Sequence, residues 1–125
     1  MKVLLDTNII LDNLLRRELG IIDIRRIYSM IAEDLIEACI TANSITNIYY
    51  LAKKRIGNSA AIDAISTIIL THNIIGIDKE DCVNALRSTI TDFEDALIVT
   101  CSIKDSVDYI IYERSGFFER SRVYA

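Results

Sequence analysis

Two apolar patterns alternate along the chain and limit the folds that it can adopt. Short apolar runs, typical of buried strands, alternate with segments in which apolar residues recur at helical spacing. The strand-like runs cover 2–5, 38–41, 74–77 and 107–112, with a short fifth run at 122–124. The helical segments cover 9–15, 24–35, 45–56, 61–69, 78–86 and 91–101. Strands separated by helices favour parallel pairing with helices on both faces, so we expect an α/β fold, a three-layer α/β/α sandwich.

Size and composition limit what such a chain can be. Its 125 residues predict one domain spanning 1–125. Although 51% of the residues are hydrophobic, no long apolar run and no leader pattern is present, which favours a soluble, cytoplasmic protein. Cys39, Cys82 and Cys101 are widely spaced among apolar neighbours and are expected to be reduced core thiols.

Charge and histidine content exclude several classes of site. The net charge is −4, with 18 acidic against 14 basic residues, so no global basic field indicates nucleic-acid binding. Such binding would need a local basic patch or a metal ion. The single histidine, His72, is expected in a turn, which argues against a histidine-based triad or a zinc site.

The stretch MKVLLDTNIILDNLL places an acid between the first strand and the first helix. Asp6 therefore lies at the carboxyl end of a strand, which is where α/β proteins bind ligands. Capping offers an alternative, because Asp6 or Thr7 can accept a hydrogen bond from the first backbone N–H groups of the helix.

A second group of acids opens a later helix. Asp92 and Asp95 are three residues apart, which places them on one face if that turn is helical. With Asp6 they would form a carboxylate cluster at one rim of the sheet, a ligand set that suits Mg²⁺ or Mn²⁺. Such an ion supports phosphodiester hydrolysis. Alternatively, these acids only interact favourably with the dipole of the helix that they precede. We assign Glu94 to a capping box that begins at Thr91.

Four segments together resemble successive blocks of the PIN-domain family, in the branch related to VapC-type toxins. They are LLDTNIILD, TANSITNIYYLAKK, DFEDALIVTCS and VDYIIYERSGFF, in that order. The resemblance implies a Rossmann-like sandwich with a parallel sheet, an acidic pocket that binds Mg²⁺ or Mn²⁺, and ribonuclease activity on single-stranded RNA. It also implies two protein partners: an antitoxin, because such toxins are often half of a toxin–antitoxin pair, and a second copy in a homodimer.

The resemblance assigns roles to particular residues of this chain. Asp6 matches the first acid of the family's pocket, and Asp95 matches the acid that starts the later helix. Asp92 is an extra carboxylate often found in this branch. Thr7 and Asn8 match a small polar pair that supports the first acid.

The chain departs from the family pattern at two positions. Asn47 occupies the place of the second acid, although it is also the third residue after a candidate Ser44 cap. Phe117 occupies the place of the last acid, and Glu113 is a candidate substitute for it. The remaining carboxylates predict a single metal ion better than a firmly held pair.

These residues lead to competing functions. The first is a metal-dependent endoribonuclease, with Arg16 and Arg17 as candidate contacts to RNA phosphates. The alternative, favoured by Asn47 and Phe117, is a catalytically impaired PIN-like domain that binds RNA or protein. A phosphatase that uses a strand-end Asp ranks last, because its second acid would fall at Asn8.

Overall fold

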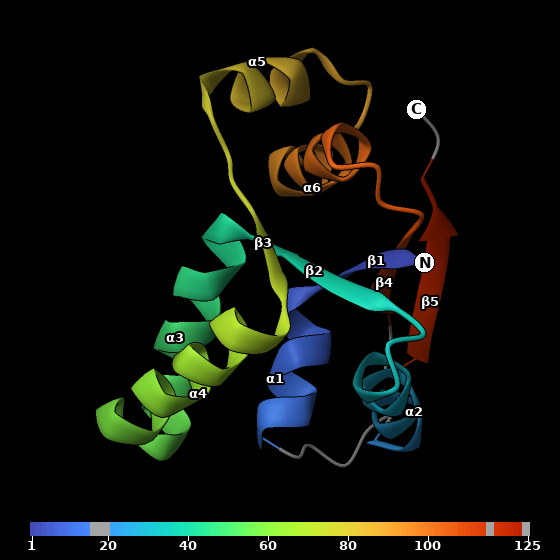
Figure 1. The fold of residues 1–125 in the computed structure, drawn as a ribbon. Helices are drawn as coiled ribbons and strands as arrows, with labels where there is room; N and C mark the ends of the chain where they lie inside the picture. The colour runs from blue at the N-terminus through green and yellow to red at the C-terminus, as the bar shows by residue number, and fades with distance from the viewer. Residues whose placement is uncertain (16–20, 115–116, 124–125) are drawn as a thin grey trace.

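The computed structural model describes residues 1–15, 21–114 and 117–123, with the backbone alone at 21–23, 113–114 and 117–120. These residues form an α/β fold with a five-stranded sheet (Figure 1). The strands are β1 (Lys2–Leu5), β2 (Glu37–Thr41), β3 (Asn73–Ile75), β4 (Tyr109–Arg114) and β5 (Phe117–Arg122). The helices are α1 (Thr7–Leu15), α2 (Ile21–Ala32), α3 (Ala42–Ile56), α4 (Asn58–Thr71), α5 (Lys79–Arg87) and α6 (Phe93–Lys104).

The sheet is parallel except at one edge. Its order is β3-β2-β1-β4-β5, and the first four strands pair in parallel, as predicted. The fifth strand was predicted wrongly: it spans Phe117–Arg122 instead of 122–124, and it pairs antiparallel with β4. The register joins Arg114 to Phe117, so the connection is too short for the crossover that a parallel neighbour needs.

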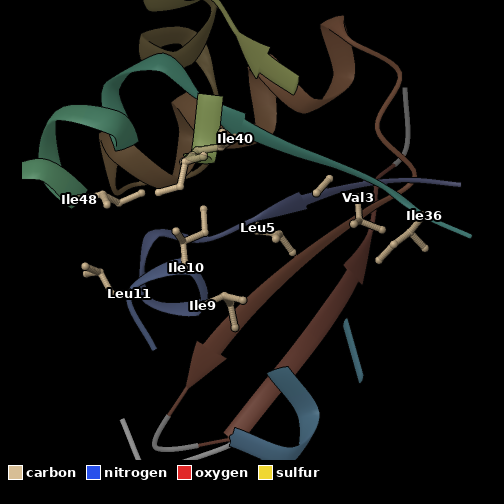
Figure 2. Close-up of a cluster of buried hydrophobic side chains, with 10 residues drawn as sticks. Val3, Leu5, Ile9, Ile10, Leu11, Ile36, Ile40 and Ile48 are labelled. Carbon is tan, nitrogen blue, oxygen red and sulfur yellow. The ribbon is translucent and has the colours of Figure 1, made fainter. Parts of the chain in front are cut away.

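Helices cover both faces of the sheet, which confirms the three layers. Val3 and Leu5 of β1 point into a core built with α1 to α4, whose buried members surround them in Figure 2. Leu4 points to the opposite face and packs with Ala96 and Cys101 of α6. This alternation follows from the strand period of two, and it places α5 and α6 across the sheet from the other helices (Figure 1).

The second helical segment is shorter than predicted. It ends at Ala32 instead of continuing to Leu35. Asp34 adopts a left-handed conformation with φ of 57°, which turns the chain toward β2, and Leu35 is left 55% exposed. The helical spacing of apolar residues therefore continues past the end of the helix, which is why the predicted segment was too long.

The three cysteines are free thiols, as predicted, and Cys39 and Cys101 are buried. His72 ends α4, in agreement with the predicted turn, but it is buried and its ring bonds to the Tyr28 hydroxyl at 3.2 Å. None of the helices in the described part of the chain combines the length and apolar character that a bilayer crossing requires.

Candidate active site

Asp6 lies where β1 passes into α1, at the carboxyl edge of the sheet. Its backbone N–H donates to the carbonyl of Ile111 on β4 at 2.9 Å, which holds this junction against the neighbouring strand. Its carboxylate accepts hydrogen bonds from the backbone N–H groups of Thr7 and Asn8. Asp6 thus caps α1 and also lies at a strand end, although these were considered as alternatives. Thr7 and Asn8 contact its carboxylate through their backbone N–H groups.

Asp95 lies in the first turn of α6, and Asp92 is the N-cap of that helix. The Asp92 carboxylate accepts from the backbone N–H of Asp95 at 2.9 Å. The predicted capping box from Thr91 to Glu94 is therefore wrong, because the helix begins one residue later than that pattern requires. Asp92 precedes the helix, so the condition for a shared helical face of Asp92 and Asp95, a helical turn at both residues, is not met.

Asp6 and Asp95 line the same pocket, which has a volume of about 360 Å³. Its other lining residues are Leu4, Ile98, Val99, Ile110, Tyr112 and Ser121. Over the described residues, no three His, Cys, Asp or Glu side chains gather in a group that could hold a metal ion. The pocket thus presents two carboxylates that lie far apart in the sequence, and Asp92 is not among its lining residues.

The electrostatics of this pocket favour a cation. Burial raises the pKa of the Asp6 carboxyl, and the nearby charge of Asp95 raises it further, whereas the N–H groups of Thr7 and Asn8 oppose the increase. A positive charge between the carboxylates would relieve this cost. Mg²⁺ commonly binds through one or two carboxylates plus water and substrate phosphate, so this donor set fits a single hard cation.

The remaining predicted residues do not join the pocket or fall outside what the structure describes. Asn47 is exposed on α3 and does not line the pocket. The helix around it begins at Ala42 after the N-cap Thr41, so the predicted Ser44 cap is wrong; Ser44 is instead buried, 3.0 Å from the Thr41 hydroxyl.

Four other predicted positions are described only in part or not at all. Glu113 belongs to β4 and pairs with β5 through its backbone, but its side chain lies outside the described part of the structure. Phe117 begins β5, and its side chain is likewise outside that part. Arg16 and Arg17 lie outside the described residues altogether.

Sequence reasoning missed two residues that line the pocket, Tyr112 and Ser121. Their hydroxyl oxygens lie 3.1 Å apart. One signal was available, because Tyr112 is two residues after the inward-facing Ile110 and therefore shares its face of the sheet. Ser121 had no such signal, since its place depends on the antiparallel pairing of β5.

The parallel strands and the flanking helices define an α/β domain, and an acidic pocket lies at the strand ends, at the edge of its sheet. The family model described as the PIN domain matches residues 2–112, and this chain belongs to that family.

Three solved structures share the fold. VapC20 from Mycobacterium tuberculosis, described as a toxin that cleaves the sarcin–ricin loop, is 15% identical, with 86% of each chain covered and a TM-score of 0.67. VapBC2 from Rickettsia felis, bound to a promoter DNA fragment, is 14% identical, covering 86% of this chain and 84% of its own, with a TM-score of 0.62. The DNA-bound VapBC from Salmonella typhimurium is 15% identical, covering 82% and 79%, with a TM-score of 0.58. The search of curated proteins finds no match to this chain.

Proposed function

We propose that this chain is a metal-dependent endoribonuclease that cleaves single-stranded RNA. The observation that carries the proposal is the pocket shared by Asp6 and Asp95, two carboxylates brought to one sheet edge in a PIN domain. Similarity to a toxin described as cleaving the sarcin–ricin loop supports this function.

In this proposal Asp6 and Asp95 hold one Mg²⁺ or Mn²⁺ ion. When bound, the ion supplies Lewis-acid activation of a phosphodiester and of a water molecule. The backbone N–H groups of Thr7 and Asn8 orient the Asp6 carboxylate. Asp92 was predicted as a further ligand, but its bond to the Asp95 N–H supports a different role, in which it positions the first turn of α6.

The proposal extends to partners. The VapBC structures similar to this chain support an antitoxin as a protein partner, and we also propose a homodimer in the cytoplasm. Ile69 and Leu70 of α4 are 53% and 86% exposed and offer apolar surface to a protein partner. Arg16 and Arg17 remain proposed contacts to RNA phosphates.

A second function is favoured by one specific observation. Asn47, in the place of the family's second acid, is neutral and lies outside the pocket lining. A pocket with two carboxylates is a weaker metal site than one with three or four. The alternative is therefore a PIN domain that binds RNA or a protein partner without efficient cleavage.

A cleavage assay separates these functions. Single-stranded RNA is incubated with wild type, Asp6→Asn or Asp95→Asn, in Mg²⁺, in Mn²⁺ and in EDTA. We expect cleavage that needs the metal and falls roughly 100-fold or more in both variants, because loss of a ligand removes several kcal/mol of charge stabilisation. Asp63→Asn, which changes an exposed acid on α4, is the matched control and should cleave as wild type does.

Two outcomes would contradict the nuclease. Equal activity in the wild type and both pocket variants would identify a contaminating ribonuclease. RNA binding by the wild type without metal-dependent cleavage would favour the binding module instead.

A further inference from the structure

The pocket that Asp6 and Asp95 line has further residues on another side, and the proposed metal chemistry does not use them. Tyr112 on β4 and Ser121 on β5 face it, with their hydroxyl oxygens 3.1 Å apart. We propose that this pocket receives one unpaired nucleobase of the RNA, and that the Tyr112 and Ser121 hydroxyls bind the polar edge of that base. The inference rests on the proposed function, because it takes RNA as the ligand.

The apolar part of the lining favours a base over the other parts of a nucleotide. Leu4 and Ile110 come from the sheet, and Ile98 and Val99 come from α6. Phosphate and ribose are strongly polar and gain little from aliphatic walls. A base has a flat face whose removal from water is favourable, and it gains further from contact with an aromatic ring such as that of Tyr112.

The size of the pocket agrees with a single base. Its volume of about 360 Å³ lies near the lower end of the range of roughly 300–1,000 Å³ for small-molecule sites. A duplex cannot enter a space of this size, whereas one base taken out of a single strand can.

The hydroxyl pair supplies the polar contacts that a base edge requires. One of the two O–H groups donates within the pair, so a base edge would meet at most one further O–H donor, together with hydroxyl oxygens that accept. Ser121 is exposed, so a ligand can reach its hydroxyl from solvent. Because the two side chains come from neighbouring strands, their separation is held by the β4–β5 pairing.

The topology places this base next to the acids. Ile111 on β4 pairs with Leu5 on β1, so Tyr112 and Asp6 follow at the same end of adjacent strands. A nucleotide whose base lies against Tyr112 would therefore carry its phosphate close to Asp6 and Asp95. In this arrangement Tyr112 and Ser121 determine which nucleotide lies at the cleavage site.

The test measures binding, so it does not depend on catalysis. A short fluorescein-labelled single-stranded RNA and a series with one abasic nucleotide at each position are titrated by anisotropy in Ca²⁺, a hard cation that offsets the negative charge of Asp6 and Asp95. For the wild type, one abasic position should weaken binding roughly tenfold, because stacking of one base contributes that much. The double variant Tyr112→Phe, Ser121→Ala should bind the intact RNA roughly three- to tenfold more weakly and bind that abasic RNA as the wild type does.

Two controls separate this role from a structural one. Tyr109→Phe removes a phenol hydroxyl from the same strand on the opposite face, and it should leave RNA affinity unchanged. Thermal melting should show similar stability for the double variant and the wild type. If the hydroxyl pair only joined β5 to β4, the melting temperature would fall and the effect of the abasic position would persist.

The outcomes also separate this inference from the proposed nuclease. Absence of RNA binding, or equal affinity for every abasic RNA, overturns the nucleobase pocket. If metal-dependent cleavage is nevertheless present, the nuclease survives alone. If the abasic position and the hydroxyl pair act as expected but no cleavage occurs, the pocket stands and the nuclease fails.

Discussion

The ion pair between Asp81 and Lys104 should stabilise the helix that carries Asp95. Lys104 ends α6, and its Nζ lies 2.6 Å from the Asp81 carboxylate and 2.8 Å from the carbonyl of Gly76. Asp81 also accepts from the backbone N–H of Asp78 at 3.0 Å, as part of the capping box of α5. The pair therefore joins the far end of α6 to α5, and Asp81→Ala tests its contribution.

The loss of stability in Asp81→Ala is the sum of two contributions, the ion pair and the capping-box hydrogen bond. Asp81 is 3% exposed, but the Lys104 side chain is 42% exposed, so solvent screening limits the ion pair to about 1 kcal/mol. Loss of the capping-box bond costs about another 1 kcal/mol. Asp81→Ala should thus lower the free energy of unfolding by about 2 kcal/mol, which corresponds to a fall of about 8 °C in Tm for a domain of this size.

Urea denaturation followed by circular dichroism measures this difference. Lys104→Gln should lose only the ion-pair part, about 1 kcal/mol. Glu80→Gln, a change at an exposed acid in the same helical turn, is the control and should stay within about 0.5 kcal/mol of wild type. A loss below about 0.5 kcal/mol in Asp81→Ala would refute the anchoring role.

The same pair predicts a pH dependence. Lys104 and the Asp78 N–H hold the pKa of the Asp81 carboxyl below its ordinary value. The stabilisation is therefore complete above the ordinary aspartate pKa of about 4 and is lost as the pH falls through the lower folded value. The difference between wild type and Asp81→Ala should be constant from neutral pH to about pH 5 and should shrink below about pH 4. A difference that shrinks already between pH 7 and 6 would contradict this account.

Two further predictions concern Asp92 and His72. Asp92→Ala should cost about 1 kcal/mol through loss of the N-cap, while Asp92→Asn should keep both the cap and RNA cleavage. Loss of cleavage in Asp92→Asn at unchanged Tm would show instead that its charge acts on the metal or the substrate. Burial lowers the pKa of His72, so the folded protein binds this proton less readily than the unfolded chain does, and stability should decrease as the pH falls below about 6.5. His72→Asn should remove this slope between pH 5 and 7, and an equal slope in the variant would assign it to other groups.

Local patterns predicted most elements because they depend on near neighbours in the chain. The run 2–5 became β1 with the predicted bounds, and α3 ended at Ile56 before Gly57, whose φ of 84° suits a residue without a side chain. Errors arose at the ends of α2 and α6 and at β5. At α6 both Thr91 and Asp92 are good capping residues, and the choice between them is not visible in their spacing.

The residues of the candidate site also differ in how well the sequence alone could place them. Asp6 could be placed from the sequence because an acid directly after a buried strand of an α/β fold lies at the carboxyl edge of the sheet. To place Asp95 beside Asp6, one must also infer that α6 packs against the face of β1 on which the Asp6 side chain lies. Asn47 could not be placed by its match to the family pattern, because the rotation of α3 against the sheet decides which of its side chains reach the pocket.

Sequence patterns were sufficient to predict the alternation of strands and helices, the parallel centre of the sheet, the free thiols and the place of the first acid. Local apolar periods place the elements, and the order of these elements along the chain favours parallel strands. Three features needed the folded structure: the 3.1 Å contact between the Tyr112 and Ser121 hydroxyls, the pocket that they share with Asp6 and Asp95, and the separation of Asp92 from that pocket. They depend on the β4–β5 register, which sets Ser121 opposite Ile110, and on how α6 packs against the sheet, and local apolar patterns encode neither.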